Sequence, residues 1–336
     1  MKRHGNLWER IITMDNLKLA YKKAVDGKKN RDEIKPIEAK LDYYLEKLQK
    51  MLINGEFHTS KYTTRIIHEP KERVIYILPF YPDRIVHHAI MNVLEPIMDD
   101  MFIDDSYSCR KFKGPHKGST KCMNYVKKYK WCLKCDISKF YPTIDHAVLK
   151  DILMMKIKDQ KVLDILFDII DSIHDTVNIP IGNYISQWFG NLYLNQLDMY
   201  VKHHLLVKPY IRYCDDFCLF SNDKKELQVW SMLIGNFIHT KLHQKFSKCD
   251  IFKTSRGVDF LGYRHFSSGK ILVRKSTAKR MKQCVASIPY LLKNGYITVN
   301  QARSKLASVI GCICHANSYN LYKKLKIDEM EAFING

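Results

Sequence analysis

The most constraining feature of this sequence is a pair of adjacent aspartates, Asp215 and Asp216, set between two short apolar runs. Apolar residues alternate over residues 209–213 and again over 217–221, and this period of two predicts two half-buried β-strands. The acidic pair is then expected at the turn of a hairpin. Two neighbouring carboxylates repel each other, and burying them without a cation is costly. Hard oxygen ligands suit Mg²⁺, whereas a solvated Asx-type turn is the other interpretation of an isolated Asp-Asp pair.

A second acidic strand end lies upstream, where Trp131–Asp136 has the pattern of a strand whose last residue is acidic. If the two strand ends are neighbours, three carboxylates converge at one edge of a sheet. Such a site suits phosphoryl transfer with two metal ions roughly 3.5–4 Å apart, because Mg²⁺ binds carboxylates together with substrate phosphates. Three cationic side chains could neutralise a triphosphate there: Lys71, Arg73 and Arg110.

Composition points to a polyanionic partner. The 336 residues carry a formal charge of +20 and are 46% hydrophobic, which indicates a globular protein that binds nucleic acid or, second, an anionic membrane surface. No apolar run of about 18 residues predicts a membrane span, and the N-terminus lacks the apolar core of a secretory signal. The ten cysteines are not spaced like those of a disulfide framework, so reduced thiols in a cytosolic protein are expected. Two groups of residues hint at a metal site: Cys132/Cys135 and Cys312/Cys314/His315. Neither group has a matching second pair of ligands at the spacing of a zinc site.

Periodicity predicts an α+β fold. Residues 1–60 have helical spacing, and residues 61–80 favour a hairpin with Lys71 and Arg73 near its tip. Residues 106–119 have the composition of a basic loop, and Asp145 is a good N-cap. Further helices are expected over 160–174, from 186, over 224–243, from 276, and over 299–315 and 318–334, with a strand and turn at 259–263.

Taken together and in order, several stretches resemble the core motifs of reverse transcriptases. They are Leu133-Lys-Cys-Asp-Ile-Ser-Lys-Phe-Tyr141, Tyr213-Cys-Asp-Asp216, Phe260-Leu-Gly-Tyr263, and the series from Arg73 through Asp83-Arg84 to Ser108-Cys-Arg110. The resemblance covers about residues 60–270. It implies a right-hand polymerase with a helical N-terminal extension (1–60), interleaved fingers and palm (61–270) and a helical thumb (271–336).

The resemblance also implies the activity and the residues that perform it. The activity is RNA-directed DNA polymerisation from dNTPs on a template RNA and a cDNA/primer duplex, with Asp136, Asp215 and Asp216 as the catalytic set. Two Mg²⁺ ions would be held by Asp136, the Ile137 carbonyl and Asp215. The incoming nucleotide would meet Lys71, Arg73, Arg110, Phe140 (a steric gate against ribose), Ile181, Gly182 and Gln187. Leu261 and Gly262 would form the primer grip, and Lys275, Lys279, Arg280 and Lys282 would contact the RNA/DNA duplex.

One departure narrows the family. Most reverse transcriptases have Pro-Gln-Gly where this chain has Pro180-Ile181-Gly182, followed by Ser186-Gln187. This pattern is similar to that of diversity-generating retroelement reverse transcriptases, which are encoded by bacteria or phages and expected in the cytoplasm. The similarity implies copying errors opposite adenine, replacement of a variable gene segment by the cDNA, and a small basic accessory protein, usually a pentamer. The alternatives are a retron, intron-like or phage-defence reverse transcriptase, or a catalytically inactive RNA-binding scaffold.

Overall fold

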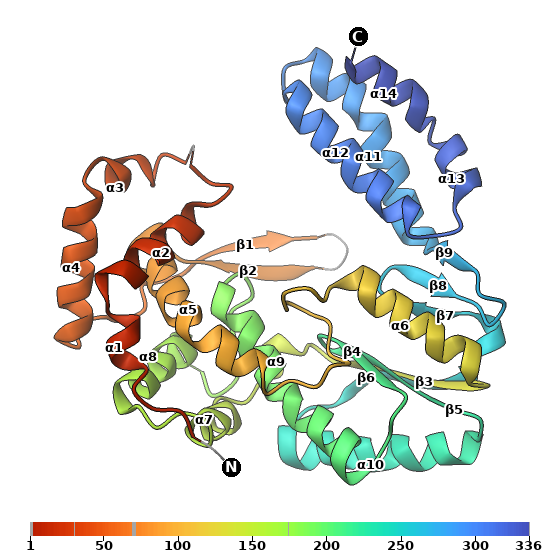
Figure 1. Ribbon diagram of the computed structural model, residues 1–336, viewed down its shortest axis with the longest axis horizontal. Helices are drawn as coiled ribbons and strands as arrows, with labels where there is room; N and C mark the ends of the chain where they lie inside the picture. Colours follow the sequence, from red (N-terminus) through yellow and green to blue (C-terminus); the bar gives the residue numbers. More distant parts are fainter. Residues whose placement is uncertain (1–2, 30, 69–71, 174, 336) are drawn as a thin grey trace. The chain divides into compact units, whose positions relative to one another are not determined.

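The computed structural model describes residues 3–29, 31–68, 72–173 and 175–335 of a mixed α+β protein (Figure 1). The chain forms two compact units. The first contains Met1–Asp104, Asp136–Leu206 and Met232–Lys248, and the second contains Asp105–Cys135, Val207–Ser231 and Cys249–Gly336. Three elements pass from one unit to the other: β3 (Trp131–Ile137), α10 (Lys224–Leu242) and β6 (Phe246–Lys253).

Helices dominate the first unit, as the helical spacing predicts. They are α1 (Trp8–Ile11), α2 (Met14–Val25), α3 (Lys35–Ala39), α4 (Leu41–Ile53), α5 (Ile85–Asp99), α7 (His146–Met154), α8 (Gln160–Asp171) and α9 (Tyr184–Met199). In α4 the stripe of Leu45, Leu48 and Leu52 is buried, which is the face that a 3.6-residue period places inward. Asp145 caps α7 as predicted, because its carboxylate accepts from the Val148 amide at 3.1 Å. No helix among the described residues is long and apolar enough to cross a membrane.

The predicted hairpin is present as β1 (Thr63–Ile67) and β2 (Arg73–Ile77), paired antiparallel with Ile67 opposite Arg73. Its predicted tip at Lys71 lies outside the described residues. The edge of β2 also holds the turn before α9, since the Tyr76 amide donates to the Ile181 carbonyl at 2.8 Å. The next residue, Gly182, has φ +125°, and a Cβ there would lie 2.4 Å from the Tyr76 carbonyl oxygen. The turn therefore needs glycine for both its backbone angle and its close approach.

Gly182→Ala is expected to destabilise the first unit by about 2–4 kcal/mol, because it combines backbone strain with overpacking against β2. The matched control is Gly55→Ala, since Gly55 has φ +71° but open space around its Cβ position. That variant should lose only about 1 kcal/mol. Urea denaturation of both variants measures the difference, and equal losses would show that contact with Tyr76 plays no part.

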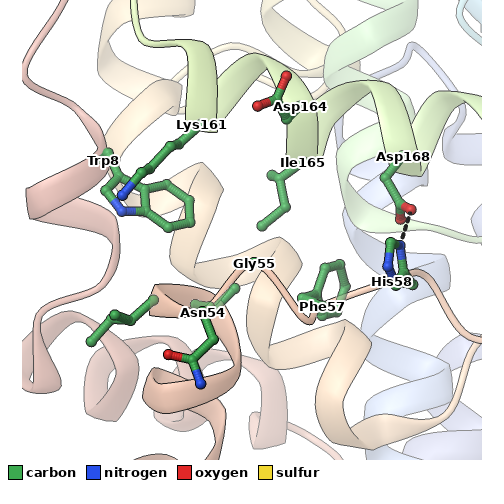
Figure 2. A pocket seen from close by; sticks show the side chains of 11 residues that line it. Trp8, Asn54, Gly55, Phe57, His58, Lys161, Asp164, Ile165 and Asp168 are labelled. Carbon is green, nitrogen blue, oxygen red and sulfur yellow. Dashed lines mark hydrogen bonds and ion pairs between the residues drawn. The ribbon is translucent and has the colours of Figure 1, made fainter.

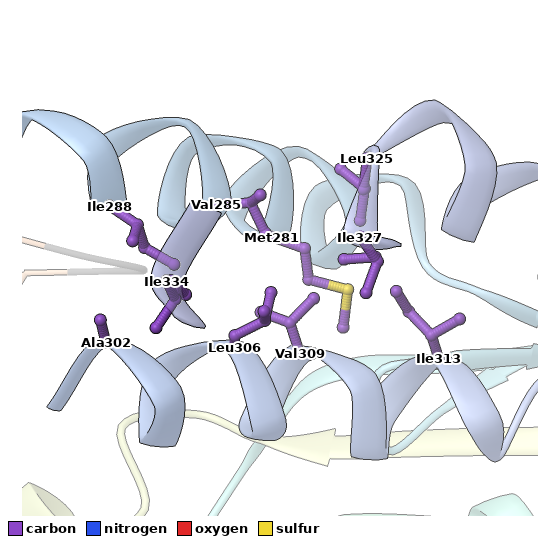
Figure 3. Close-up of a cluster of buried hydrophobic side chains, with 10 residues drawn as sticks. All are labelled: Met281, Val285, Ile288, Ala302, Leu306, Val309, Ile313, Leu325, Ile327 and Ile334. Atoms are coloured by element: carbon purple, nitrogen blue, oxygen red, sulfur yellow. The ribbon is translucent and has the colours of Figure 1, made fainter. Parts of the chain in front are cut away.

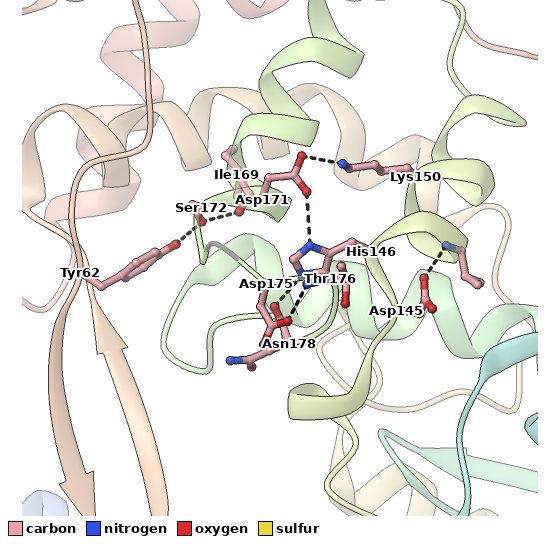
Figure 4. Close-up of polar contacts among 11 residues, drawn as sticks. Tyr62, Asp145, His146, Lys150, Ile169, Asp171, Ser172, Asp175, Thr176 and Asn178 are labelled. Atoms are coloured by element: carbon pink, nitrogen blue, oxygen red, sulfur yellow. Dashed lines mark hydrogen bonds and ion pairs between the residues drawn. The ribbon is translucent and has the colours of Figure 1, made fainter.

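A polar network holds the chain between α8 and Gly182 (Figure 4). His146 Nε2 donates to the Asn178 carbonyl at 2.9 Å, and its Nδ1 lies 3.3 Å from the Asp171 carboxylate. Asp171 also pairs with Lys150, and the Asn178 side-chain amide donates to the Tyr76 hydroxyl at 3.2 Å. The network therefore fixes the segment that leads to the turn at Ile181.

A cavity of about 300 Å³ lies in the first unit, lined by residues of α1, the end of α4 and α8 (Figure 2). Its most strongly bonded carboxylate is Asp168, which accepts from the Thr59 amide and hydroxyl, each at 2.7 Å, and lies 3.0 Å from His58 Nδ1. These bonds tie the chain after α4 to α8, and we assign Asp168 a structural role.

The second unit contains the predicted acidic hairpin, β4 (Tyr210–Tyr213) and β5 (Asp216–Ser221), in a four-stranded sheet of order β4-β5-β3-β6. Every residue from Tyr210 to Arg212 and from Phe217 to Ser221 is buried, so the prediction of half-buried strands is wrong for both β4 and β5. One face packs against α6 (Pro115–Lys128) in a cluster that includes Cys122 and Phe220. A near-continuous apolar run such as that of β5 is typical of a strand covered on both faces.

The predicted basic loop over 106–119 is shorter than expected. Helix α6 begins at Pro115, and Gly114 is its N-cap with φ 97°. Proline is common at the first position of a helix, because its φ is already helical and an amide there would have no hydrogen-bond partner within the helix. The basic residues from His116 onward are therefore helical.

The chain ends in a second sheet and a helical bundle. Strands β7 (Val258–Phe260), β8 (Tyr263–His265) and β9 (Ile271–Val273) form an antiparallel meander, followed by α11 (Lys275–Lys293), α12 (Val299–Cys314), α13 (Tyr319–Lys324) and α14 (Ile327–Asn335). Figure 3 shows the apolar core of the bundle, which includes Met281, Leu306 and Ile334. The single helix predicted over 318–334 is divided, because Lys326 adopts φ +52°, and a left-handed residue interrupts an α-helix.

Three histidines of the second unit meet around Ser119. His265 Nδ1 donates to the Val258 carbonyl at 3.1 Å, so its neutral Nε2 accepts from the Ser119 hydroxyl at 2.7 Å. The Ser119 oxygen in turn accepts from His315 Nε2 at 2.8 Å, and the His315 ring stacks on His116 with centroids 4.4 Å apart. This arrangement joins α6, β8 and the end of α12, and it requires a neutral His265.

Stability is therefore expected to fall as the pH is lowered. Burial lowers the pKa of His265 to about 4, with His315 contributing further, against about 6.5 in an unfolded chain. The folded state binds fewer protons, so this contribution is complete above about pH 6.5 and is lost towards pH 4, by about 1.4 kcal/mol per pH unit. Urea denaturation at pH 7, 6 and 5 should show a smaller pH dependence for His265→Gln than for the wild type. The exposed His239 supplies the control, and a His239→Gln variant should retain the wild-type dependence.

Candidate active site

Asp215 lies in a two-residue turn, and Asp216 is the first residue of β5. Tyr213 pairs with Asp216 across the hairpin, so Cys214 and Asp215 form the loop. Cys214 has φ +55°, a left-handed conformation that costs a non-glycine residue roughly 1–3 kcal/mol. Its neighbours hold it there, because the Ser108 hydroxyl donates to Cys214 Sγ at 3.4 Å and Arg212 Nη1 donates to the Cys214 carbonyl at 3.1 Å. The turn that carries Asp215 is therefore fixed by contacts on both sides.

Arg212 is a buried residue beside the acidic turn that the sequence analysis did not single out. It is 0% exposed, although a charged side chain is almost never fully buried unless it is paired. Its backbone amide donates to the Asp105 carbonyl at 3.0 Å, so the chain at Asp105 runs beside β4. The signal in the sequence was a charged residue within an apolar strand directly before the acidic turn.

Lys134 is a second residue that the sequence analysis missed. It lies on β3, next to β5 in the sheet, and its ammonium nitrogen is 3.0 Å from the Asp216 carboxylate. The same ammonium donates to the Asp259 carbonyl and lies 5.7 Å from the centroid of the Phe260 ring. Burial lowers the pKa of Lys134, but Cys218 and Asp216 raise it by more, so the net pKa is above its usual value. Lys134 is therefore charged at neutral pH and links Asp216 to β7.

Asp136 is half-buried near the end of β3, in the first compact unit, whereas Asp215 and Asp216 belong to the second. The Ser247 hydroxyl oxygen lies 2.6 Å from Asp136 Oδ2 and 3.1 Å from its carbonyl oxygen. Ser247 thereby orients the Asp136 carboxylate. The side chain of the next residue, Ile137, is 2% exposed, so only its backbone could serve as a ligand.

In the described ranges, no three His, Cys, Asp or Glu side chains form a group that could hold a metal ion. Mg²⁺ commonly keeps several waters and is bound by one or two carboxylates plus substrate phosphates, and aspartate side chains such as those of Asp136 and Asp215 are donors of that type. Burial raises the pKa of Cys132 and Cys135 well above the usual value, so both thiols are protonated.

The residues predicted to contact the nucleotide differ in exposure. Phe140 is 3% exposed and packs near the Tyr193 ring, with centroids 6.4 Å apart. Arg73 on β2 and Gln187 on α9 are exposed, and Ile181 is half-buried. Arg110 is half-buried and donates to the Ser106 carbonyl at 3.0 Å. Lys71 lies outside the described residues.

The predicted primer grip is a tight turn. Leu261 and Gly262 connect β7 to β8 with φ +57° and +84°. Positive φ at both central residues matches the twist of the flanking strands in a hairpin.

The predicted duplex contacts on α11 are all exposed: Lys275, Lys279, Arg280 and Lys282. The opposite face of α11 is buried in the bundle, so the four cations remain available to a polyanion.

Comparisons with known proteins agree with these motifs. A family model described as reverse transcriptase (RNA-dependent DNA polymerase) matches residues 67–265, more than half of the chain. Protein YkfC of Escherichia coli (strain K12) is 25% identical over 309 residues, which cover 75% of this chain and 77% of YkfC.

Two proteins associated with introns are also similar. The group II intron-encoded protein LtrA of Lactococcus lactis subsp. cremoris is 24% identical over 276 residues, covering 60% of this chain and 45% of LtrA. Nuclear intron maturase 1 of Arabidopsis thaliana is 30% identical over 117 residues, covering 35% of this chain and 16% of its own length. The match to the family model over the segment that holds the acidic hairpin leads to one conclusion: the chain belongs to the reverse transcriptase family and is an RNA-directed DNA polymerase.

Proposed function

We propose that this reverse transcriptase is of the diversity-generating type. It copies a template RNA into cDNA with frequent errors opposite adenine, and the cDNA then replaces a segment of a target gene. The proposal rests on one observation: Ile181 occupies the position where most reverse transcriptases have glutamine. Its backbone is held by Tyr76, and its side chain offers no hydrogen-bond donor or acceptor.

The physical argument concerns selectivity. Fidelity depends on how much more tightly the correct transition state is held than an incorrect one. Without a polar side chain at position 181, the incoming nucleotide loses a contact that positions it, and mispairs are less disfavoured. A difference of about 1.4 kcal/mol changes a rate ratio tenfold. The loss of this contact explains lower selectivity in general. That the errors occur mainly opposite adenine is implied by the family resemblance alone.

We also propose the right-hand arrangement of fingers, palm and thumb, with Asp136, Asp215 and Asp216 as the catalytic carboxylates. Asp136, Asp215 and the Ile137 carbonyl bind the metal ions, and Asp216 is held by Lys134. When bound, two Mg²⁺ ions supply Lewis acidity at the attacking and leaving oxygens. Phe140 excludes ribonucleotides, and Arg73 and Arg110, together with Lys71, bind the triphosphate. The Leu261–Gly262 turn positions the primer.

The proposed partners are the template RNA, the cDNA/primer duplex and a small basic accessory protein that forms a pentamer. Net charge cannot attract a basic protein to a chain of formal charge +20, because like charges repel. Contact therefore requires a local acidic patch or bridging by RNA. None of the ten cysteines forms a disulfide, which favours the reducing cytoplasm as the compartment.

The test is the error spectrum of the cDNA. Wild-type protein copying a defined RNA should make errors mainly opposite adenine, and Ile181→Gln should lower the adenine error rate about tenfold, which corresponds to one restored contact of about 1.4 kcal/mol. Deep sequencing scored by template base measures both. Ile53→Gln is the control, because Ile53 is 50% exposed on α4, and this variant should retain the wild-type spectrum.

Two results would decide against the proposal. Faithful copying of adenine by the wild type would favour an intron-like enzyme, which the similarity to LtrA makes the second candidate. An unchanged adenine error rate in an active Ile181→Gln variant would remove Ile181 from the error mechanism.

A further inference from the structure

A basic pocket of about 260 Å³ lies within the first compact unit. Its lining comes from three segments distant in the sequence: α2 with the loop after it, the start of α5, and the first turn of α9. The lining residues that matter here are Lys23, Lys28, Arg84, His87 and His88. The volume is several times that of one liquid water, about 30 Å³, so a polyatomic ligand fits.

Two buried polar atoms at this pocket lack a partner. Within the described part of the chain, Arg84 Nε and His87 Nε2 are buried and make no hydrogen bond, and the His87 side chain is 2% exposed. Leaving such a group unsatisfied is costly, and native structures contain few of them. A bound ligand would relieve this cost.

The pocket also concentrates positive charge. It contains three cationic side chains and no carboxylate. Burial lowers the pKa of Lys28, and the nearby Arg84 lowers it further, while Asp26 and Glu33 oppose this from outside the pocket. Burial followed by the charges of Lys28, Lys23 and Arg84 lowers the pKa of His88 to about 4. The three cations therefore repel one another in the free protein, and an anion would neutralise them.

Helix α9 adds a partial positive charge. Its first turn lines the pocket, and its N-cap residue, Asn183, does not cap it with a side-chain hydrogen bond. The Asn183 side chain instead donates to the Tyr62 hydroxyl at 2.8 Å. The amides at a helix N-terminus attract anions and phosphate groups.

We infer that this pocket binds one backbone phosphate of the template RNA strand. A nucleoside triphosphate normally arrives with Mg²⁺, which needs carboxylate ligands, and the pocket lining has none. A single phosphodiester needs only cations and N–H donors. The inference rests on the RNA-directed polymerase activity and is independent of the diversity-generating assignment.

The experiment compares two double variants with the same change in charge. Lys23→Gln/Lys28→Gln alters the pocket, whereas Lys22→Gln/Lys29→Gln alters exposed lysines that do not line it. Binding of a primer annealed to an RNA template with a single-stranded overhang is measured by fluorescence anisotropy over a range of KCl concentrations. The pocket variant should bind about tenfold more weakly, and its slope of log K against log salt should be shallower by about one. The control should differ from wild type by less than about twofold.

Other results would overturn the inference. Equal loss in the two double variants would make the effect one of general charge, and unchanged binding in both would remove the pocket from RNA recognition. A raised KM for dNTP with unchanged RNA affinity would assign the phosphate to the nucleotide. A wild-type protein that binds no template–primer duplex would instead count against the polymerase activity itself.

Discussion

Asp215→Asn is expected to lower primer extension on an RNA template at least about a thousandfold, equivalent to about 4 kcal/mol of transition-state stabilisation. Asparagine keeps the shape of the side chain and removes its charge, so the loss reports on metal binding and not on packing. The fold should be retained, because removing one of two adjacent carboxylates relieves their repulsion. Single-nucleotide incorporation and thermal unfolding of the same preparation measure the two effects.

Asp250→Asn is the matched control, because Asp250 is an exposed aspartate on β6 of the same sheet. It should extend primers at the wild-type rate. An Asp215→Asn variant that retained more than a tenth of the wild-type rate would show that the hairpin turn does not carry the chemistry.

Lys134→Met is expected to lower kcat about a hundredfold, or about 2.7 kcal/mol. The variant removes the ammonium that lies 3.0 Å from the Asp216 carboxylate and donates to the Asp259 carbonyl. The uncompensated charge of Asp216 would then shift the arrangement of the acidic turn. Because a competing cation is lost, the site should also saturate at a lower Mg²⁺ concentration, although it works more slowly.

The Mg²⁺ dependence separates positioning from general damage, since a merely loosened site would need more Mg²⁺. Lys134→Arg should recover part of the rate, because arginine keeps the charge while changing the donor geometry. Lys128→Met, at an exposed position on α6, should behave as wild type. A raised Mg²⁺ requirement in Lys134→Met would argue against the proposed role of this lysine.

Local chemistry explains the sequence predictions that the structure confirms. The period of two on either side of Asp215–Asp216 predicted the β4–β5 hairpin, and it forms with those residues at its turn. Asp145 was recognisable as an N-cap because a carboxylate satisfies free amides at a helix start. Such signals act over a few residues, so they can be read without knowing which segments meet.

Predictions failed where distant segments decide the outcome. Both faces of β4 and of β5 are buried, which alternation within one strand could not reveal. Arg212 and Lys134 were not singled out by the sequence analysis. Each is held beside the acidic turn by contacts with residues from other strands or loops. The split between α13 and α14 depends on the left-handed backbone at Lys326, for which lysine gives no signal.

The sequence by itself determined the motifs of a reverse transcriptase, the α+β composition and the turn that carries Asp215 and Asp216, because each depends on residue types at short, fixed spacings. The tertiary structure alone decided that Lys134 on β3 contacts Asp216 on β5. It alone also gathered Lys23, Lys28 and Arg84 around one pocket. Strand order and helix packing arise from the burial of apolar surface across the whole chain, and that effect is non-directional, so no local pattern encodes which charged side chains it brings together.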